Sequence, residues 1–236
     1  MQFDDKVIVL TGVGREGQVG EVVARAFAEQ GARVVVVDVE ESEVRARADA
    51  LRAAGFDAKS YACDLTDEAQ VRALAQDVAS LHPRGVDALI NLAGGFAQTG
   101  PVAESRLDGW QRQFAINLTT SFLTTRAFLP LLRQTRGTVV FFASAAALPN
   151  AKVATMSAYA AAKSGVVVLM RAVAEEEREH GVRANALAPT SIRTSANITS
   201  MGDKMRYVER EEVANAVLFL CSPAASAVNG QVIVLG

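Results

Sequence analysis

The sequence predicts an α/β protein in which a doubly wound parallel sheet of about seven strands lies between two layers of helices. Two observations predict this. Short runs rich in β-branched residues alternate with longer segments of helical periodicity along all 236 residues. Most of the short runs are almost wholly apolar, as expected for strands buried on both faces of a parallel sheet. Such alternation produces right-handed βαβ units and a three-layer αβα arrangement.

The short apolar runs are the predicted strands, and none has the length of a helix. They are Lys6–Thr11, Arg33–Asp38, Ala58–Ala62, Asp87–Asn91, Thr138–Ala143, Arg183–Ala188 and Gln231–Leu235.

The segments between the strands are the predicted helices. Gly31, Gly55 and Gly181 stand where three of them should end, as helix-terminating glycines do. No linker or repeat interrupts the pattern, so we expect a single domain over residues 1–236. The helices are Val19–Gln30, Glu41–Ala54, Asp67–Leu81, Leu107–Gln134, Thr155–His180 and Glu211–Cys221.

The composition predicts a soluble protein with a substantial core. Apolar residues make up 50% of the chain and charged residues 21%. The formal net charge of −2 gives no electrostatic reason to expect nucleic acid or an anionic membrane as a partner. The first residues lack the order of a signal peptide, and no apolar run approaches the length of a membrane span. We therefore expect a cytoplasmic protein.

Cysteine and histidine are too few to predict a metal centre. Cys63 and Cys221 lie far apart in unlike contexts and are interpreted as small core residues rather than a disulfide or a metal pair. His82 and His180 are the only histidines, and each stands at the end of a helical stretch. We expect no metal site.

A glycine-rich turn, TGVGREGQVG, connects the first predicted strand to the first helix. Gly12, Gly14 and Gly17 have the spacing G-x-G-x-x-G, and Gly20 follows. Glycine lets the backbone approach a pyrophosphate, whose charge then meets the N–H groups at the helix start. Methyltransferases and purely structural loops share such turns, but the strand before and the helix after favour a dinucleotide.

An acidic residue, Asp38, ends the second predicted strand. A carboxylate there accepts hydrogen bonds from the adenosine ribose hydroxyls and repels a 2′-phosphate, so the sequence favours NAD(H) over NADP(H). One alternative is that Asp38 caps the next helix. Another is that Arg15, in the glycine turn, pairs with a 2′-phosphate.

Two further turns follow later strands. Asp64 and Leu65 come after the third strand, where Asp64 would receive the adenine amino group and Leu65 would supply a backbone contact. The stretch NLAGG begins at Asn91, after the fourth strand, and its small residues would let the chain pass close under a cofactor. Either stretch alone is also compatible with an ordinary turn.

Tyr159 and Lys163 are four residues apart on a predicted helix, so they share one face. A phenol titrates near ~10, and a neighbouring cation favours its ionised form. That arrangement suits proton exchange with a carbonyl or alcohol oxygen. The alternative is a helix surface with an incidental aromatic residue and a solvated lysine.

Together these motifs resemble the short-chain dehydrogenase/reductase family over nearly the whole chain. The glycine turn, Asp38, Asp64-Leu65 and the NLAG stretch are similar to its cofactor motifs. Asn117 in FAINL, Ser144 in FAS, and Tyr159 with Lys163 are similar to its catalytic residues, in the same order. Pro189, in APTSIRT, is similar to the first residue of its P-G motif.

The resemblance implies a Rossmann-like fold and an NAD(P)-dependent oxidoreductase that interconverts an alcohol and a ketone or aldehyde. Tyr159 would exchange a proton with the substrate oxygen, and Lys163 would lower the pKa of Tyr159 and bind the nicotinamide ribose. Ser144 would hold the substrate oxygen, and Asn117 would position a water that links Lys163 to solvent. The alternatives are a small strand-end residue for Ser144 and a buried helix asparagine bonded to backbone for Asn117. The implied cofactor-binding residues are Gly12, Gly14, Arg15, Gly17, Val19, Gly20, Asp38, Asp64, Leu65, Asn91, Ala93, Gly94, Tyr159, Lys163, Pro189, Ile192 and Thr194.

The sequence also departs from the family pattern. The glycine turn is longer than usual, and Gln18 takes the place of a customary glycine. Leu92 replaces an asparagine, Ala143 replaces the first serine of a pair, and Thr190 replaces a glycine. None of these changes removes a proton-handling group, so we expect a competent enzyme.

The residues after Pro189 predict a mobile lid over 194–210, with Gly202 as a hinge. Phe96, Met156 and the loop 148–154 would give mixed apolar and polar walls, which suggests a small or medium carbonyl compound. Arg193 either meets a substrate carboxylate or forms a surface salt bridge.

The resemblance further implies a homodimer or homotetramer formed through the long helices that begin near Leu107 and Thr155. Rival enzyme functions are a 3-oxoacyl-thioester reductase and a reductase of a pterin-type C=N bond. Outside enzymes, the alternative is an NADH-binding regulatory protein, which would have no use for the Ser–Tyr–Lys set.

Overall fold

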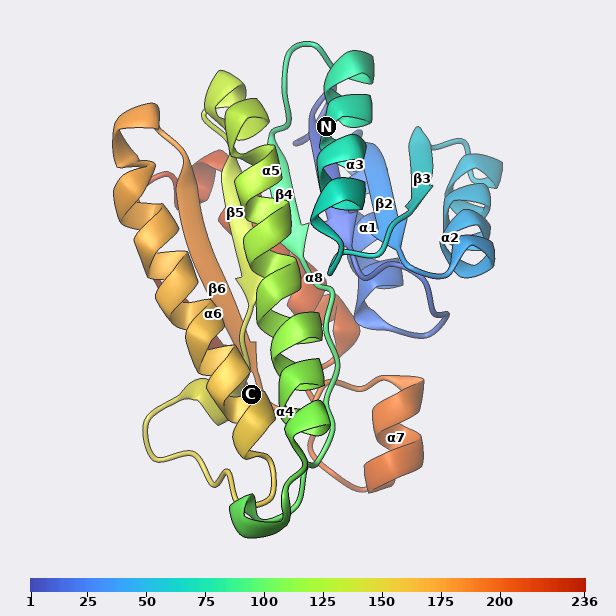
Figure 1. Ribbon diagram of the computed structural model, residues 1–236. Helices are drawn as coiled ribbons and strands as arrows, with labels where there is room; N and C mark the ends of the chain where they lie inside the picture. The colour runs from blue at the N-terminus through green and yellow to red at the C-terminus, as the bar shows by residue number, and fades with distance from the viewer.

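The computed structural model describes residues 1–236 and contains one seven-stranded sheet in the order β3-β2-β1-β4-β5-β6-β7 (Figure 1). Every neighbouring pair of strands is parallel. The predicted fold class is confirmed, and each predicted strand lies within one residue of its expected ends. The strands are β1 (Val7–Thr11), β2 (Arg33–Asp38), β3 (Ala58–Ala62), β4 (Ala88–Asn91), β5 (Thr138–Phe142), β6 (Arg183–Pro189) and β7 (Val232–Leu235).

Helices cover both faces of the sheet. In Figure 1, α3, α5 and α6 lie on the face toward the viewer, and α1 and α8 lie behind the sheet. The helices are α1 (Val19–Glu29), α2 (Glu41–Ala53), α3 (Glu68–Leu81), α4 (Leu107–Phe114), α5 (Thr120–Thr135), α6 (Ser157–Glu176), α7 (Ser195–Met201) and α8 (Arg210–Cys221), with short 3-10 turns at Val102–Glu104, Ala145–Ala147, Arg178–His180 and Pro223–Ala225.

The strands are apolar at nearly every position because both faces of the sheet are buried. Val7 and Val9 of β1 belong to a core of 27 buried residues shared with α3, α5 and α6. Ile8 and Leu10 belong to a second core of 25 residues shared with α1, α2 and α8. Successive side chains of a strand point to opposite faces, so each face requires its own apolar set.

The predicted helix Leu107–Gln134 is wrong in one respect, because it is interrupted. A π-helical turn, Ala115–Thr119, separates α4 from α5 and has Asn117 at its centre. The backbone N–H of Thr120 donates to the carbonyl of Ala115, five residues back. One inserted residue shifts the apolar stripe by less than a third of a turn, so the hydrophobic pattern did not predict it.

Helix ends differ from the prediction where the backbone turns sharply. The helix predicted from Thr155 begins at Ser157, because Thr155 has a left-handed φ of 65°. It ends at Glu176 and continues only as a 3-10 turn. Asp67 is the N-cap of α3 rather than its first helical residue, since its side chain accepts from the N–H groups of Ala69 and Gln70.

One helix, α7, was not predicted. It lies in the polar segment interpreted as a lid, and Thr194 caps it by accepting from the N–H of Asn197. Its few apolar residues give no amphipathic stripe, which is why the sequence pattern gave no signal.

The prediction that no apolar run approaches the length of a membrane span is wrong for one helix, α6. By length and composition alone, Ser157–Glu176 could cross a membrane. Half of its apolar window is buried inside the protein, as in the core helix of a soluble protein.

Candidate active site

The predicted functional residues gather at the carboxyl ends of β1, β4 and β5. The first three strands of the chain, β1, β2 and β3, follow one another on one side of the sheet. The fourth strand, β4, then pairs with the other edge of β1. Loops on either side of such a switch point diverge and leave a crevice for a ligand. The glycine loop follows β1, Gly94 follows β4, and Ser144 follows β5.

The glycine loop packs directly against the loop after β4. Gly12 has a φ of 74°, and a Cβ atom there would lie 2.8 Å from the backbone nitrogen of Ala93. That nitrogen donates to Oγ1 of Thr11 at 3.1 Å. A Cβ at Gly20 would lie 2.5 Å from the carbonyl oxygen of Gly12. Only glycine permits this approach of two backbones, which forms a side-chain-free cradle.

The first turn of α1 carries no side-chain cap. Its N-cap residue, Gln18, makes no capping hydrogen bond. The N–H of Gly17 instead donates to Glu21 Oε2 at 2.8 Å, and Glu21 Oε1 accepts from Arg47 Nη1 at 2.8 Å. An uncapped helix start attracts negative charge, so this cradle fits the pyrophosphate of a dinucleotide.

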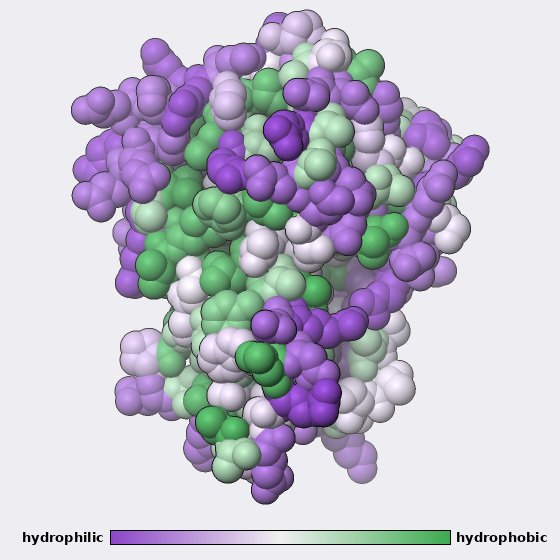
Figure 2. Space-filling model, in the orientation of Figure 1, coloured by the Kyte–Doolittle hydropathy of each residue, from purple (hydrophilic) through white to green (hydrophobic).

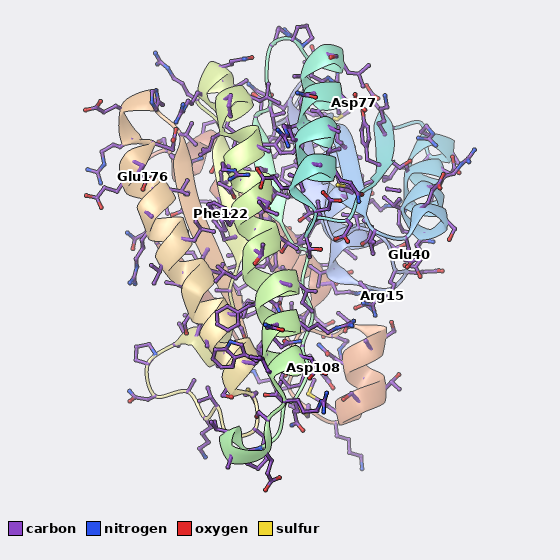
Figure 3. All side chains as sticks on the ribbon, in the orientation of Figure 1. Arg15, Glu40, Asp77, Asp108, Phe122 and Glu176 are labelled. Atoms are coloured by element: carbon purple, nitrogen blue, oxygen red, sulfur yellow. The ribbon has the colours of Figure 1, made fainter.

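Asp38 closes the crevice at the end of β2. Its Oδ1 accepts from the N–H of Val39 at 2.8 Å, and Oδ2 has no hydrogen bond within the protein. A Cβ atom at Gly14 would lie 2.7 Å from the Asp38 carboxyl carbon, so the loop packs against this side chain. Arg15 is exposed on the outer side of the same loop (Figure 3).

Asp64 and Asn91 use their side chains locally. Asp64 Oδ1 accepts from both the N–H and the hydroxyl of Thr66, at 2.9 and 2.7 Å. The buried amide of Asn91 accepts from Thr124 Oγ1 at 2.7 Å and donates to Thr125 Oγ1 at 2.9 Å. In this arrangement Asn91 fixes β4 to α5 and offers a ligand only its backbone.

Asn117 and Lys163 meet at Gly94. A Cβ atom at Gly94 would lie 2.6 Å from Asn117 Oδ1 and 3.4 Å from Lys163 Nζ. The amide of Asn117 bonds Gly95 in both directions, accepting from its N–H at 3.1 Å and donating to its carbonyl at 2.9 Å. It also donates to the carbonyl of Gln113 at 3.1 Å. The Asn117 side chain is therefore hydrogen-bonded to the backbone of Gly95 and Gln113, and its role in positioning a water molecule stays a prediction.

Burial shifts the pKa values of Tyr159 and Lys163 in opposite directions. Burial raises the pKa of Tyr159, and a hydrogen bond with Ser144 opposes part of that rise. Lys163 is only 6% exposed, and desolvation lowers its own pKa to about 8. Its Nζ lies 5.9 Å from the Tyr159 ring centroid and donates to the carbonyl of Phe142 at 2.7 Å. Ser144 is thus a group that favours the phenolate here, and the effect expected of Lys163 on the pKa of Tyr159 stays a prediction.

Phe96 forms an aromatic wall beside Tyr159. The two rings meet edge to face, with centroids 5.1 Å apart and planes at 89°. Ser144 Oγ accepts from the N–H of Ala146 at 3.2 Å, which begins a 3-10 turn after β5. The acid–base candidates thus lie between an apolar ring and a strand end.

The residues after β6 form the segment that was predicted to be a lid. Pro189 is the last residue of β6, and Ile192 forms a parallel bridge with Val208. Thr194 is buried, and its hydroxyl accepts from the N–H of Asn197 at 3.1 Å. Ile192 and Thr194 thus anchor the start of this segment.

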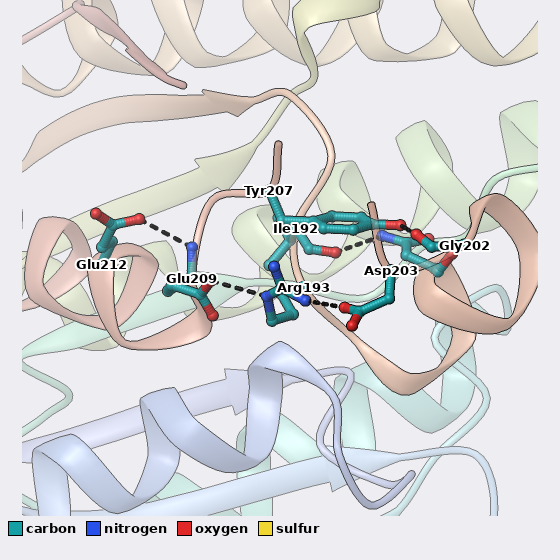
Figure 4. A network of polar contacts seen from close by, with 8 residues as sticks. Ile192, Arg193, Gly202, Asp203, Tyr207, Glu209 and Glu212 are labelled. Atoms are coloured by element: carbon teal, nitrogen blue, oxygen red, sulfur yellow. Dashed lines mark hydrogen bonds and ion pairs between the residues drawn. The ribbon is translucent and has the colours of Figure 1, made fainter. Parts of the chain in front are cut away.

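Arg193 forms salt bridges, the second of its two predicted roles. Its guanidinium contacts Asp203 and, at 2.8 Å, Glu209 (Figure 4). It also lies 4.9 Å from the centroid of the Tyr207 ring, whose hydroxyl donates to the carbonyl of Gly202 at 2.6 Å. The positive charge of Arg193 is therefore neutralised within the lid.

One contact of the site was not predicted. Gln18 Nε2 donates to Ser195 Oγ at 3.0 Å, joining the glycine loop to α7. The departure of Gln18 from the family glycine was the only sequence signal, because the two residues are 177 positions apart. No group of three or more His, Cys, Asp or Glu residues is placed to hold a metal ion, and both cysteines are free.

Comparison with known proteins covers the whole chain. A family model described as enoyl-(acyl carrier protein) reductase matches residues 12–235. D-threitol dehydrogenase of Mycolicibacterium smegmatis is 33% identical, with 99% of this chain and 92% of the relative aligned. 7alpha-Hydroxysteroid dehydrogenase of Escherichia coli is 32% identical over 99% and 93% of the two chains. Meso-2,3-butanediol dehydrogenase of Serratia marcescens is 34% identical over 98% and 92%.

Solved structures agree with these relatives. The crystal structure of a putative short-chain dehydrogenase/reductase from Burkholderia xenovorans superposes with a TM-score of 0.90 at 34% identity, covering 99% of this chain and 96% of that one. A short-chain dehydrogenase from Mycobacterium smegmatis gives 0.87 at 32% identity, covering 100% and 93%. The cradle, the strand-end residues and these matches lead to one conclusion: the chain belongs to the short-chain dehydrogenase/reductase family and is an oxidoreductase that interconverts alcohols and carbonyl compounds with a nicotinamide dinucleotide.

Proposed function

We propose that Ser144, Tyr159, Lys163 and Asn117 carry out the proton chemistry of this enzyme. The observation that supports this most directly is their convergence. Ser144 is near enough to Tyr159 to oppose part of the rise in its pKa, while Gly94 lies against both the Asn117 amide and the Lys163 ammonium. When bound, the dinucleotide supplies or accepts the hydride.

Tyr159 donates a proton to the carbonyl oxygen during reduction and removes it from the alcohol during oxidation. Its raised pKa keeps the phenol protonated at neutral pH, which suits reduction. Ser144 holds the substrate oxygen and stabilises negative charge on it. Lys163, once its ammonium turns from the Phe142 carbonyl to a ribose hydroxyl, brings its charge beside the phenol and favours the phenolate that oxidation needs.

The proposed cofactor is NAD(H) rather than NADP(H). The free Oδ2 of Asp38 supports this, because it is available to ribose hydroxyls and would repel a 2′-phosphate. Gly14 holds the loop close to this carboxylate. Arg15 is the residue that would support the opposite preference.

The proposed substrate is an uncharged alcohol or ketone of small to medium size. Relatives named for D-threitol, meso-2,3-butanediol and a 7alpha-hydroxysteroid support this class. Phe96 offers an apolar wall, and the neutralised Arg193 offers no cation for a substrate carboxylate. A 3-oxoacyl-thioester substrate is the second candidate, and the enoyl-(acyl carrier protein) reductase description of the matching family model supports it only as far as the acyl-thioester class.

The proposed assembly is a homodimer or homotetramer in the cytoplasm. Figure 2 shows apolar residues gathered on the face that carries α5 and α6. Phe122 of α5 is 43% exposed, and Val168 of α6 is 66% exposed. A second copy would cover this surface, as an isologous interface requires.

Replacing Tyr159 by phenylalanine tests the proposed chemistry. Tyr159→Phe should lower kcat by about 100-fold or more, because a positioned acid–base group contributes at least that factor. NADH affinity, followed by nicotinamide fluorescence, should stay within about twofold, since no base or phosphate contact changes. If the variant binds NADH much more weakly but keeps the wild-type kcat at saturating NADH, the assigned role is contradicted.

A further inference from the structure

Gln18 directs its side chain away from the helix that it begins. As the N-cap of α1 it makes no capping hydrogen bond, and its amide instead donates to Ser195 Oγ at 3.0 Å. A glycine, the usual residue of the family at this place, has no side chain to make that contact. The contact is therefore a property of this chain.

The Gln18–Ser195 contact crosses the carboxyl edge of the sheet. The glycine loop follows β1, whereas α7 follows β6, and β4 and β5 lie between these two strands. Three strand spacings amount to about 14 Å. Gly94 after β4 and Ser144 after β5 belong to the edge that the contact spans.

The start of α7 also packs on the backbone of the glycine loop. A Cβ atom at Gly17 would lie 3.1 Å from Ser195 Oγ and 4.0 Å from Arg210 Nη1. The far end of α7 is fixed by Tyr207, whose hydroxyl donates to the carbonyl of Gly202. The lid helix is thus attached to the lid network at one end and to the glycine loop at the other.

We propose that Gln18 is a positioning residue that holds α7 on the glycine loop through Ser195 and so closes the outer side of the dinucleotide site. The inference rests on the proposed function, because the glycine loop must bind the pyrophosphate. With the bridge in place, the dinucleotide leaves only after the Gln18–Ser195 hydrogen bond breaks. The bridge slows dissociation without taking part in proton transfer.

A double-mutant cycle measures the bridge directly. NADH is displaced from wild type, Gln18→Ala, Ser195→Ala and the double variant by excess NAD⁺, and the loss of nicotinamide fluorescence gives the dissociation rate. Each single variant should release NADH about 3- to 10-fold faster, the factor expected for one hydrogen bond. The double variant should be no faster than either single variant, because both remove the same interaction.

Controls separate positioning from folding. Ser195→Thr keeps the hydroxyl and should restore slow release, while Gln76→Ala, on the exposed surface of α3, should leave release unchanged. The melting temperature should change little in all variants, since the contact is exposed. Unchanged release in both single variants, or additive effects in the double variant, would overturn the bridge alone. A wild-type protein that binds no NADH would instead overturn the proposed function, and the bridge with it.

Discussion

Lys163 carries an ammonium group in a position that is only 6% exposed, with one hydrogen bond to a carbonyl. Desolvation lowers the pKa of Lys163 from 10.5 to about 8. A buried charge of this kind destabilises the fold and persists where a function needs it. The role proposed for Lys163 therefore comes with a cost in stability.

Replacing Lys163 by methionine should stabilise the protein at neutral pH. Between about pH 8 and pH 10.5 the unfolded chain holds more protons at this residue than the folded one, so wild-type stability rises with pH across that window. Lys163→Met should increase the free energy of unfolding by about 2–3 kcal/mol at pH 7. Urea unfolding at pH 7 and at pH 10.5 measures this. A gain that persists undiminished at pH 10.5 would contradict buried charge as the cause.

Asp38 gives a second prediction at the residue scale. Asp38→Ala removes the proposed acceptor for the ribose hydroxyls and the charge that would repel a 2′-phosphate. The ratio of the NADPH and NADH dissociation constants should fall by about tenfold, as for loss of a charged hydrogen bond. Fluorescence titration with both cofactors measures the ratio, and Arg15→Ala is the matched control. The proposed preference is wrong if Arg15→Ala binds NADPH more weakly than wild type does while Asp38→Ala leaves the ratio of the dissociation constants unchanged.

At the scale of elements, one ion pair joins two helices at the end opposite the crevice. Arg133 of α5 contacts the carboxylate of Glu177, just beyond α6, through two hydrogen bonds of 2.8 and 2.7 Å. The Glu177 side chain is 3% exposed and that of Arg133 is 43% exposed. The hydrogen bonds with Arg133 lower the pKa of Glu177, so the ionised form stabilises the fold.

Glu177→Gln should lower the free energy of unfolding by about 1–2 kcal/mol at pH 7, a value reduced by the exposure of Arg133. The pKa of Glu177 is depressed in the folded state, so its contribution is complete above the ordinary pKa of 4.5 and is lost as the pH falls through the folded value. Denaturation at pH 7 and in acid checks the sign. The two proteins should converge in acid, and a constant difference would argue against the ion pair.

The π-helical turn is the other feature that belongs to this scale. It places Asn117 where its amide bonds Gly95 in both directions and lies against Gly94. The π-helical turn contains one extra residue. Without it, the helix would be continuous and Asn117 would be rotated by about 100° around the helix axis, away from this contact. The π-helical turn therefore positions the Asn117 side chain, for which a role in the site is proposed.

At the scale of the whole molecule, the exposed apolar surface of α5 and α6 predicts self-association. Val168→Asp should convert the assembly to monomers of 25.0 kDa, because a symmetric interface would bring two buried carboxylates together. Light scattering after size exclusion measures the mass. Leu81→Asp, at another exposed apolar residue at the end of α3, should change nothing. A wild-type monomer, or an oligomeric Val168→Asp variant, would contradict this surface as the interface.

The sequence by itself determined the features that depend on neighbours in the chain. The continuous apolar run of β1, the glycines in the first turn, and the spacing of Tyr159 and Lys163 are local features of the chain, so the fold class and family motifs could be predicted. Tertiary structure alone decided the partners of Asn117, the raised pKa of Tyr159, the salt bridges of Arg193 and the contact of Gln18 with Ser195. These depend on burial and on groups brought together from distant segments, and burial changes the energy of a charge more than any residue beside it in the sequence.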